Sequence, residues 1–558
     1  MEVLLKELHS RGHQLTVLRS NSSWYIPESA PHYTSVSVRL MEDELDLSFY
    51  DNMVQRVLEI RRMGPVMRFL WQQAEMASMQ ALGHGICAKM AALMLEDSAL
   101  MARLRDAGFE LVLTDPGLPF GVLLAHYLHL PLVYNVRWMN TGDSHFAMAP
   151  SPPSYVPVSG SELGDRMDFP QRAQNLLHYA AGFLQERLLI VPLYRDLLHR
   201  HFPPGSDLLS MQRSAHLWLI RSDFVFEFPR PTVPNAVYVG GFQCRPARPL
   251  PAWLEEFVQS SGEHGVVVMS LGTLVSTLPA HINEAVAAAF ARLPQKVVWR
   301  HTGPAPVALG NNTLLLDWLP QNDLLGHPKT RAFLAHGGTN GLYEAIYHGV
   351  PVLGLPLLFD QFDNLLRLRV RGAARVLEAA TLSAEEVLEA LRDVLENPSY
   401  RRALRGLSRL HRDRPLPPLR SASFWIEHVL RHGGASHLRS GAYHLPWYSY
   451  HSLDIVGTLF VITLIFVIVF GPYHLVGSYK FVAFFLTADR CGLEHSLFLP
   501  YRLCYGLTSL NNLLDPLFYI FLSNNIRQEL RSMPCLSKGS TTSEAVCHNH
   551  PLELDDRL

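Results

Sequence analysis

Short apolar runs that stop at glycine and lead into helical periodicity recur along most of the chain. One such unit begins with Arg331–His336 (RAFLAH), turns at Gly337-Gly338, and continues with apolar residues at helical spacing up to Ile346. A second apolar run, Val350–Leu355 (VPVLGL), follows directly. Apolar runs of about four to eight residues that alternate with helical segments are typical of buried strands in a parallel α/β sheet. The pattern therefore predicts a strand–turn–helix–strand unit in this region.

Further segments extend this alternation in both directions. Five more runs predict strands: Gln14–Leu18, Phe109–Asp115, Leu217–Leu219, Gly265–Ser270 and Lys296–Arg300. Helical patterns predict two or three helices in Leu40–Met101, divided near Gly64-Pro65, and helices at Val3–Leu8, Arg172–Arg200, Leu382–Glu396 and Arg420–Arg431. The run CRPARPLP at Cys244–Pro251 is typical of a linker. We therefore expect an α/β protein with one domain at residues 1–243, a linker at 244–255 and a second domain at 256–435.

The C-terminal part of the chain changes to a membrane pattern. No formally charged residue occurs from Ile455 to Tyr479, and the core Leu459–Phe470 is wholly apolar. This length exceeds the ~20 residues that span a bilayer, and the aromatic residues of Pro446–Asp454 are typical of an interfacial belt. The expected order is a juxtamembrane segment at 436–454, a transmembrane helix at 455–476, a second candidate span at 499–523 and a tail at 524–558.

Composition narrows the functional classes. The chain has 558 residues, too many for a single core, and a formal net charge of −2 at pH 7. This balance gives no basic surface for nucleic acid, so we expect no nucleic-acid partner. The 6 cysteines lie apart without a CxxC pair, and no HExxH-type pair occurs among the 27 histidines. We therefore expect no metal site and no disulfide framework.

The turn at Gly337-Gly338 has the features of an anion site. Backbone N–H groups are unpaired at a helix start, and the helix dipole favours a negative ligand there. Glycine has no Cβ, so a phosphate can approach the backbone closely. His336 can donate an N–H to that phosphate, and Glu344, one turn into the helix, can accept from a ribose diol. The sequence thus predicts a phosphate-binding site at this strand–helix junction.

Polar residues around this unit can complete the site. Asp360 and Gln361 follow the second strand at its C-terminal end, the edge where open α/β sheets bind ligands. Upstream, Trp318 offers a flat face for a base, and Gln321 can hydrogen-bond the edge of that base. Each feature alone is also compatible with an ordinary βαβ unit in which the glycines only form a turn. Their ordered combination favours ligand binding.

The ordered run Trp318–Asn364 resembles the signature of the UDP-glycosyltransferases, most closely the vertebrate UDP-glucuronosyltransferases. The resemblance covers roughly Met1–Asp454, including the FEFPRP segment within Phe224–Val239. It implies the GT-B fold, in which two Rossmann-like domains face each other across a cleft and the helix at Arg420–Arg431 crosses back to the first domain. It also implies that the UDP-sugar is bound by Ser270, His336, Gly338 and Asn340 at the diphosphate, by Trp318, Gln321 and Glu344 at uracil and ribose, and by Asp360 and Gln361 at the sugar.

The resemblance further implies a catalytic pair. Asp115, at the end of a predicted strand, matches the carboxylate that orients a catalytic histidine in the manner of a triad. In the family that histidine follows a signal peptide and a first strand, and the residues before Gly12 match none of these. His9 and His13 are expected at the surface or as capping residues. We therefore expect an intact donor site, impaired catalysis, and an open place in the N-terminal sheet.

Two functions are compatible with these features. The first is an inverting transferase that moves glucuronic acid from UDP-glucuronate, or another sugar from its UDP-sugar, to a hydroxyl of a small lipophilic acceptor without metal or other cofactor. The alternative is a catalytically impaired membrane protein that binds UDP-sugar and forms homo- or hetero-oligomers with active relatives. The family implies detoxification in the endoplasmic reticulum membrane with a lumenal catalytic domain. Met1–Ser20 contains no apolar signal, whereas sequons at Asn21 and Asn311 fit the lumen.

The last part of the chain carries a second resemblance. Residues 511–530 (NNLLDPLFYIFLSNNIRQEL) resemble the seventh helix, and the helix after it, of a rhodopsin-like G-protein-coupled receptor. Phe470–Leu475 (FGPYHL) resembles the end of the sixth helix. The five preceding receptor helices do not occur in this sequence, which excludes a ligand-gated receptor. Asp515 is assigned no role because its usual helical partners are missing. A fusion of neighbouring coding segments explains this tail better than an evolved two-module protein.

Overall fold

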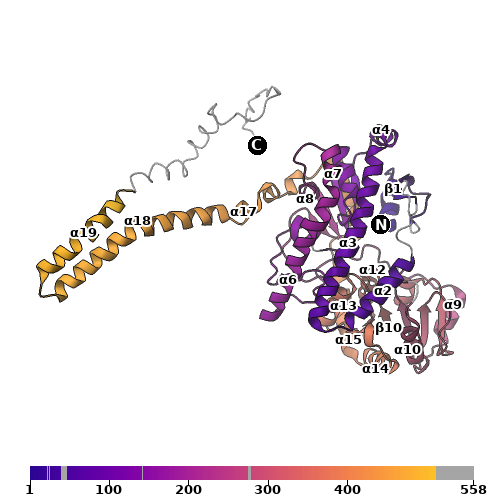
Figure 1. Ribbon diagram of the computed structural model, residues 1–558. Coiled ribbons are helices and arrows are strands. Elements are labelled where there is room, and N and C mark those ends of the chain that lie inside the picture. The colour runs from indigo at the N-terminus through magenta and orange to yellow at the C-terminus, as the bar shows by residue number, and fades with distance from the viewer. Residues whose placement is uncertain are drawn as a thin grey trace, which may run out of the picture. The chain divides into compact units, whose positions relative to one another are not determined.

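The computed structural model describes residues 1–21, 23, 26–38, 47–140, 142–273, 275 and 278–510 (Figure 1). Contacts divide the chain into two compact units, Met1–Tyr443 and His444–Leu558. The strands of the described residues all lie in the first unit, where they form three parallel sheets. The described part of the second unit is helical.

The C-terminal half of the first unit is built on a six-stranded parallel sheet with the order β12-β11-β10-β7-β8-β9. Parallel sheets are covered on both faces, so their strands are apolar throughout, and every residue of β7 (Val266–Ser270) is buried. β8 has its predicted bounds, and the predicted strands at β7, β10 and β11 are confirmed. The strands beside β7 are β8 (Lys296–Arg300), β9 (Thr313–Leu316), β10 (Thr330–Ala335), β11 (Val352–Gly354) and β12 (Ala374–Val376).

Alternate residues of β7 pack into two different apolar clusters, one on each face of the sheet. Val267 and Met269 join the cluster of α10 and α14, whereas Val266 and Val268 join that of α9, α12 and α15. The helix predicted at Leu382–Glu396 is α14, which a capping box at Ser383 starts. The bounds are α9 (Ala252–Gln259), α10 (Ala280–Ala291), α11 (Gln321–Leu325), α12 (Thr339–His348), α13 (Gln361–Val370), α14 (Ala384–Glu396), α15 (Pro398–Arg412) and α16 (Pro418–His432).

The strands of the N-terminal half form two separate parallel sheets. β3 (Val112–Thr114), β4 (Leu132–Val136), β5 (Leu217–Ile220) and β6 (Ala236–Tyr238) make a four-stranded sheet in that order. β1 (Thr16–Ser20) pairs only with β2 (Thr34–Val38) among the described strands. The two sheets are thus separate among the described strands, and the open place expected in the N-terminal sheet stays a prediction.

Helices of the N-terminal half follow the predicted pattern closely. The described part of the run Leu40–Met101 contains α2, α3 and the start of α4, and the break falls where predicted, since Pro65 is the first residue of α3. The predicted helical stretch Arg172–Arg200 is α6, a π-helical turn η2 and α7. The bounds are α1 (Glu2–Ser10), α2 (Leu47–Arg61), α3 (Pro65–Glu96), α4 (Ser98–Asp106), α5 (Phe120–Tyr127), η1 (Gly142–Met148), α6 (Phe169–Gln185), η2 (Glu186–Ile190), α7 (Val191–His201) and α8 (Leu208–Arg213).

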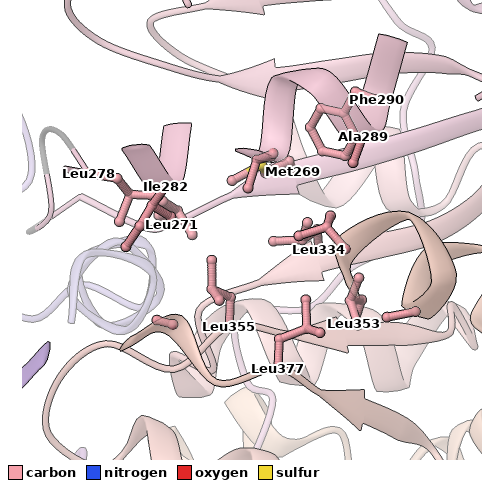
Figure 2. Packing of buried hydrophobic residues seen from close by; sticks show 14 of the residues in the cluster. Met269, Leu271, Leu278, Ile282, Ala289, Phe290, Leu334, Leu353, Leu355 and Leu377 are labelled. Atoms are coloured by element: carbon pink, nitrogen blue, oxygen red, sulfur yellow. The ribbon is translucent and has the colours of Figure 1, made fainter. Parts of the chain in front are cut away.

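The two halves exchange helices. Met53, Val54 and Leu58 of α2 belong to the C-terminal apolar cluster, in which Figure 2 shows side chains of β7, β10 and β11 facing those of α10. In the opposite direction, Ile426 and Val429 of α16 pack with residues of β4 and β5. The crossing-back that was expected for the helix at Arg420–Arg431 is thus confirmed. Each half therefore completes part of the other half's core.

The second unit begins with α17 (Trp447–Tyr450) and continues with the long helix α18 (Leu453–Leu486). α18 has 34 residues, more than the predicted span 455–476, and it is the one helix of the described residues that is long and apolar enough to cross a membrane. It packs against α19 (Arg490–Thr508), with an ion pair between Lys480 and Glu494 at 2.7 Å. The predicted span 499–523 begins within α19, and its residues 511–523, like the tail 524–558, lie outside the described residues.

Candidate active site

The C-terminal ends of three central strands meet at one edge of the six-stranded sheet. Pairing aligns Ser270 with Ala335 and Ala335 with Gly354, so β7, β10 and β11 end side by side. The residues that follow these strands, including His336, therefore leave the sheet at one place. This is the edge where open α/β sheets bind ligands.

His336 lies at this edge between two glycines. Its Nδ1 is 3.4 Å from the backbone oxygen of Ser270, and a Cβ on Gly272 or Gly338 would collide with its ring. Burial lowers the pKa of His336 from 6.5 to about 4; the Ser270 hydrogen bond opposes this effect and the Arg300 charge adds to it. The imidazole is therefore neutral near pH 7. With Nδ1 donating to Ser270, Nε2 carries the lone pair.

The turn after His336 leads directly into α12. Gly337 has a φ of 98°, in the left-handed region that favours glycine, and Gly338 is the N-cap residue. No side chain among the described residues caps this end of the helix. The first-turn N–H groups therefore remain available, and together with the helix dipole they suit an anionic ligand.

Gln321 and Glu344 lie on neighbouring helices and bond each other. Gln321 begins α11, and its Nε2 donates to Oε2 of Glu344 at 2.7 Å. Burial raises the pKa of Glu344 above its ordinary value, against the effect of this hydrogen bond. Trp318, shortly before α11, is 69 % exposed, and the guanidinium carbon of Arg300 lies 5.7 Å from its ring centroid. An exposed indole of this kind can stack on a base.

Asp360 and Gln361 lie at the start of α13, close to the start of α12. Oδ2 of Asp360 accepts from Oγ1 of Thr339 at 3.2 Å and from Nδ2 of Asn364 at 2.7 Å. Burial raises the pKa of Asp360, while the Asn364 hydrogen bond lowers it. The side-chain oxygen of Gln361 accepts from two backbone N–H groups of the preceding loop. Only the NH₂ group of Gln361 is therefore left for a ligand.

The four-stranded sheet offers the same kind of edge in the N-terminal half. Asp115, Arg137 and Arg221 directly follow β3, β4 and β5, which pair in parallel along their C-terminal ends. Oδ1 of Asp115 accepts from the N–H of Gly117 at 3.0 Å. Burial raises the pKa of Asp115, and the charges of Arg137 and Arg221 act in the opposite direction.

A hydrogen bond joins the two edges. Nη2 of Arg221 donates at 2.7 Å to Oδ1 of Asn340, which lies in the first turn of α12. Burial lowers the pKa of Arg221 to about 10, the charge of Arg137 lowers it further, and Asp115 raises it. The charge of Arg137 also lowers the pKa of Asp360. The positive charge of Arg137 thus acts on Asp115 of the N-terminal half and on Asp360 of the C-terminal half.

Three arginines of the site were missed in the sequence. Arg300 is the last residue of β8, and Arg137 and Arg221 directly follow β4 and β5. The position after a buried parallel strand always falls at the ligand-binding edge, so a signal was present. For Arg137 this signal could not be used, because Leu132–Val136 was not predicted as a strand, whereas strands were predicted next to Arg221 and up to Arg300.

A histidine partner for Asp115 was not found. In the described part of the chain no histidine is hydrogen-bonded to this carboxylate. His9 is exposed on α1, and Nε2 of His13 is 3.4 Å from Oε1 of Glu427, so both lie at the surface as predicted. The described residues also contain no group of three or more His, Cys, Asp or Glu placed to hold a metal ion.

Solved structures share this architecture. The chain is similar to the glycotransferase of kitacinnamycin, with a TM-score of 0.52 and 19% identity over 77% of this chain and 94% of that one. It is similar to CalG4, the calicheamicin glycosyltransferase, with a TM-score of 0.50, 19% identity and the same coverage of both chains. Identity at this level concerns the fold alone. The fold is the GT-B fold of glycosyltransferases, as predicted.

Sequence comparison defines the family within this class. The chain belongs to the family described as "UDP-glucoronosyl and UDP-glucosyl transferase", whose model matches residues 1–487. It is 43% identical to UDP-glucuronosyltransferase 2B13 of Oryctolagus cuniculus, over 82% of this chain and 87% of that protein. It is 41% identical to UDP-glucuronosyltransferase 2A2 of Homo sapiens, over 83% and 86%. The predicted class, a UDP-glycosyltransferase, is thereby confirmed, and the match extends past Asp454 through α18.

Proposed function

We propose that the chain transfers glucuronic acid from UDP-glucuronate to a hydroxyl of a small lipophilic acceptor, with inversion at the anomeric carbon. The observation that carries this proposal is the hydrogen bond from Arg221 to Asn340 at 2.7 Å. This bond brings the edge of the N-terminal sheet, where Asp115 lies, close to the start of α12. A donor bound at α12 and an acceptor bound beside Asp115 can then react in one cleft. The names of the relatives, which are UDP-glucuronosyltransferases, support the same reaction.

The donor's nucleoside is assigned to the α11 side of the site. Trp318 stacks on uracil, because its ring is largely exposed. Gln321 and Glu344 bind the edge of the base and the ribose, and their mutual bond of 2.7 Å holds both side chains in position. Arg300, beside the indole, adds positive charge near the diphosphate.

The diphosphate is assigned to the start of α12. The N–H groups that follow Gly338, the backbone near Asn340, Ser270 at the end of β7, and His336 surround this position. The unpaired N–H groups at the start of a helix stabilise the negative charge that develops on UDP as it leaves. These groups can therefore take the part that a metal ion would play in this step. Asp360 and the NH₂ group of Gln361 then contact the sugar hydroxyls.

The carboxylate of glucuronic acid is assigned to Arg137 and Arg221. These two guanidinium groups lie at the edge of the N-terminal sheet with Asp115, and the charge of Arg137 also acts on Asp360. Guanidinium groups pair with carboxylates in a planar, bidentate manner. A sugar carboxylate would give these guanidinium groups a further partner that an uncharged hexose lacks, which favours glucuronate over glucose as the sugar.

In the reaction, the acceptor oxygen attacks the anomeric carbon on the face opposite UDP, and the bond to UDP breaks. The proton of the acceptor hydroxyl passes to a base on the N-terminal side. Asp115 lies there with a pKa raised by burial, and it either receives this proton or stabilises the charge that a neighbouring base gains.

A second function is favoured by one observation. Because no histidine bonds Asp115 within the described residues, the chain could bind UDP-sugar and turn it over poorly, as a partner of active relatives. In both cases α18 is proposed as the membrane anchor of a protein of the endoplasmic reticulum that acts on lipophilic compounds.

Turnover and binding separate the two functions. The full chain in detergent is given UDP-glucuronate and a set of phenols, beside Asp115→Asn and a control, Asp168→Asn, which keeps a capping residue at the start of α6. For an active transferase, Asp115→Asn lowers kcat/KM by about 10²–10⁴-fold, while the control is unchanged. Binding of UDP-glucuronate without product favours the second function, and absence of binding overturns both.

A further inference from the structure

Two pockets away from the candidate active site share His216. One has a volume of about 240 Å³ and lies against the last turn of α16, and the other has about 180 Å³ and lies beside α5. We call them together the histidine–arginine pocket, after the side chains that distinguish their lining: His126, His129, His216, His428, His432, His437 and Arg439.

The lining of this pocket carries positive charge and no negative charge. Neither Asp nor Glu occurs among the described residues that line it. The guanidinium of Arg439 supplies a positive charge to this lining. Such a potential favours an anion. It disfavours a metal ion, since the arginine would repel it and the described residues provide no three-ligand group.

Arg439 has an unsatisfied donor. Its Nε is buried without a hydrogen-bond partner, and no carboxylate within the described residues forms an ion pair with its guanidinium. Nε2 of His428, in the adjoining part of the pocket, is also buried without a partner. Buried donors are nearly always paired, so the free Nε of Arg439 indicates room for an acceptor beside this side chain.

His216 connects the pocket to the fold. Its Nδ1 accepts from the backbone N–H of Ala435 at 2.9 Å, which leaves Nε2 as an N–H donor in the neutral ring. The same bond holds the turn after α16 against the N-terminal half, where Ala435 is buried with residues of β5. The ring of His216 is therefore held in place by a bond to the buried residue Ala435.

We propose that the histidine–arginine pocket binds a phosphate group, with Arg439 as its main partner and Nε2 of His216 as a second donor. A guanidinium offers parallel N–H groups that match two phosphate oxygens. The pocket shares no residue with the diphosphate position at the start of α12. Because Arg439 closely precedes α18 in the sequence, the phosphate can belong to a lipid headgroup as well as to a soluble molecule.

The test uses the full chain in detergent and follows its thermal unfolding as inorganic phosphate replaces chloride at constant ionic strength. Phosphate is expected to raise the unfolding temperature of the natural sequence. Arg439→Gln should weaken the apparent phosphate affinity by about tenfold or more, because a hydrogen bond to a charged group is lost. Arg402→Gln, on the exposed face of α15, is the matched control and should leave the affinity unchanged.

A second variant and a lipid arm complete the test. His129→Asn, which tolerates the φ of 54° at this position, should weaken phosphate binding less than Arg439→Gln. The chain is then placed in vesicles of phosphatidylcholine, and phosphatidic acid is added. Phosphatidic acid should displace inorganic phosphate if the pocket binds the phosphate group of a lipid. Inorganic phosphate should stay bound if the pocket binds a soluble phosphate. The proposal is overturned if neither phosphate nor phosphatidic acid stabilises the chain beyond chloride, or if Arg439→Gln responds as the control does.

Discussion

The proton on His336 determines how this residue can serve a diphosphate. In the free chain its Nδ1 faces the oxygen of Ser270 and its pKa is lowered to about 4, so Nε2 carries a lone pair near pH 7. A lone pair repels phosphate oxygens, whereas an imidazolium donates from both nitrogens. A bound diphosphate therefore stabilises the charged form and raises the pKa.

Binding of UDP-glucuronate should consequently take up a proton at His336. Since the pKa starts at about 4 and rises on binding, affinity should fall as the pH increases above about 4, until the bound form has also lost this proton. Calorimetric titration in buffers of different ionisation enthalpy measures the uptake. His336→Gln should abolish it and weaken binding, and a natural chain that binds without proton uptake would contradict this assignment.

Stacking on Trp318 gives a second prediction at this scale. Trp318→Ala should weaken UDP binding by about tenfold or more, because base–aromatic stacking contributes about 1–3 kcal/mol. The matched control is Trp253→Ala on α9, an indole that is 55 % exposed and lies outside the site. Equal affinities of the two variants in titration calorimetry would remove Trp318 from the site.

Much of the arrangement at the C-terminal edge of the six-stranded sheet was predictable, because its residues lie in one stretch of the chain. The order strand, glycine pair, helix and strand placed His336, Gly338, Asn340 and Asp360 at one edge before the fold was known. For Arg137, Arg221 and Arg300 the sequence offered only their positions at strand ends, which do not show that the three lie near one another. What unites them is the order of strands in two sheets, which depends on contacts between distant segments.

At the scale of elements, apolar patterns located strands and helices better than they located sheet boundaries. β8 has its predicted bounds, and α2 and α3 divide where predicted, because glycine and proline act locally. The separation of β1 and β2 from β3 involves pairing between distant segments, which no local pattern records. The same reason explains why the position of α2 in the C-terminal core was not predicted.

The insertion of α2 into that core has a measurable consequence. Leu58 is 3 % exposed within the C-terminal cluster, so Leu58→Ala should lower the free energy of unfolding by about 2–5 kcal/mol. Leu70→Ala on α3, where the side chain is 53 % exposed, should change it by less than about 0.5 kcal/mol. Denaturant unfolding of the two variants tests whether α2 is structural. Similar effects of both would place α2 outside the core.

At the scale of the whole first unit, several buried bonds hold the two halves in register around the site. Asp363 of α13 accepts from the N–H groups of Gly160 and Glu162 at 2.7 and 3.0 Å. Arg61 of α2 pairs with Glu162 at 2.6 Å and with Glu378 at 2.7 Å. The side chain of Asp363 is buried, whereas Glu162 and Glu378 are partly exposed, so the bonds to Asp363 should contribute more than these ion pairs to holding the halves together.

The most direct test of a UDP-glucuronate site in this cleft is the ratio of dissociation constants for UDP-glucose and UDP-glucuronate, measured by calorimetry with the full chain. The carboxylate is the difference between the two donors, and Arg137 and Arg221 are its proposed partners. The natural sequence should prefer UDP-glucuronate, and Arg137→Gln should reduce this preference by about tenfold, one lost charged hydrogen bond. Equal affinity for both donors, or a preference that Arg137→Gln leaves intact, would contradict the assignment of a UDP-glucuronate site to this cleft.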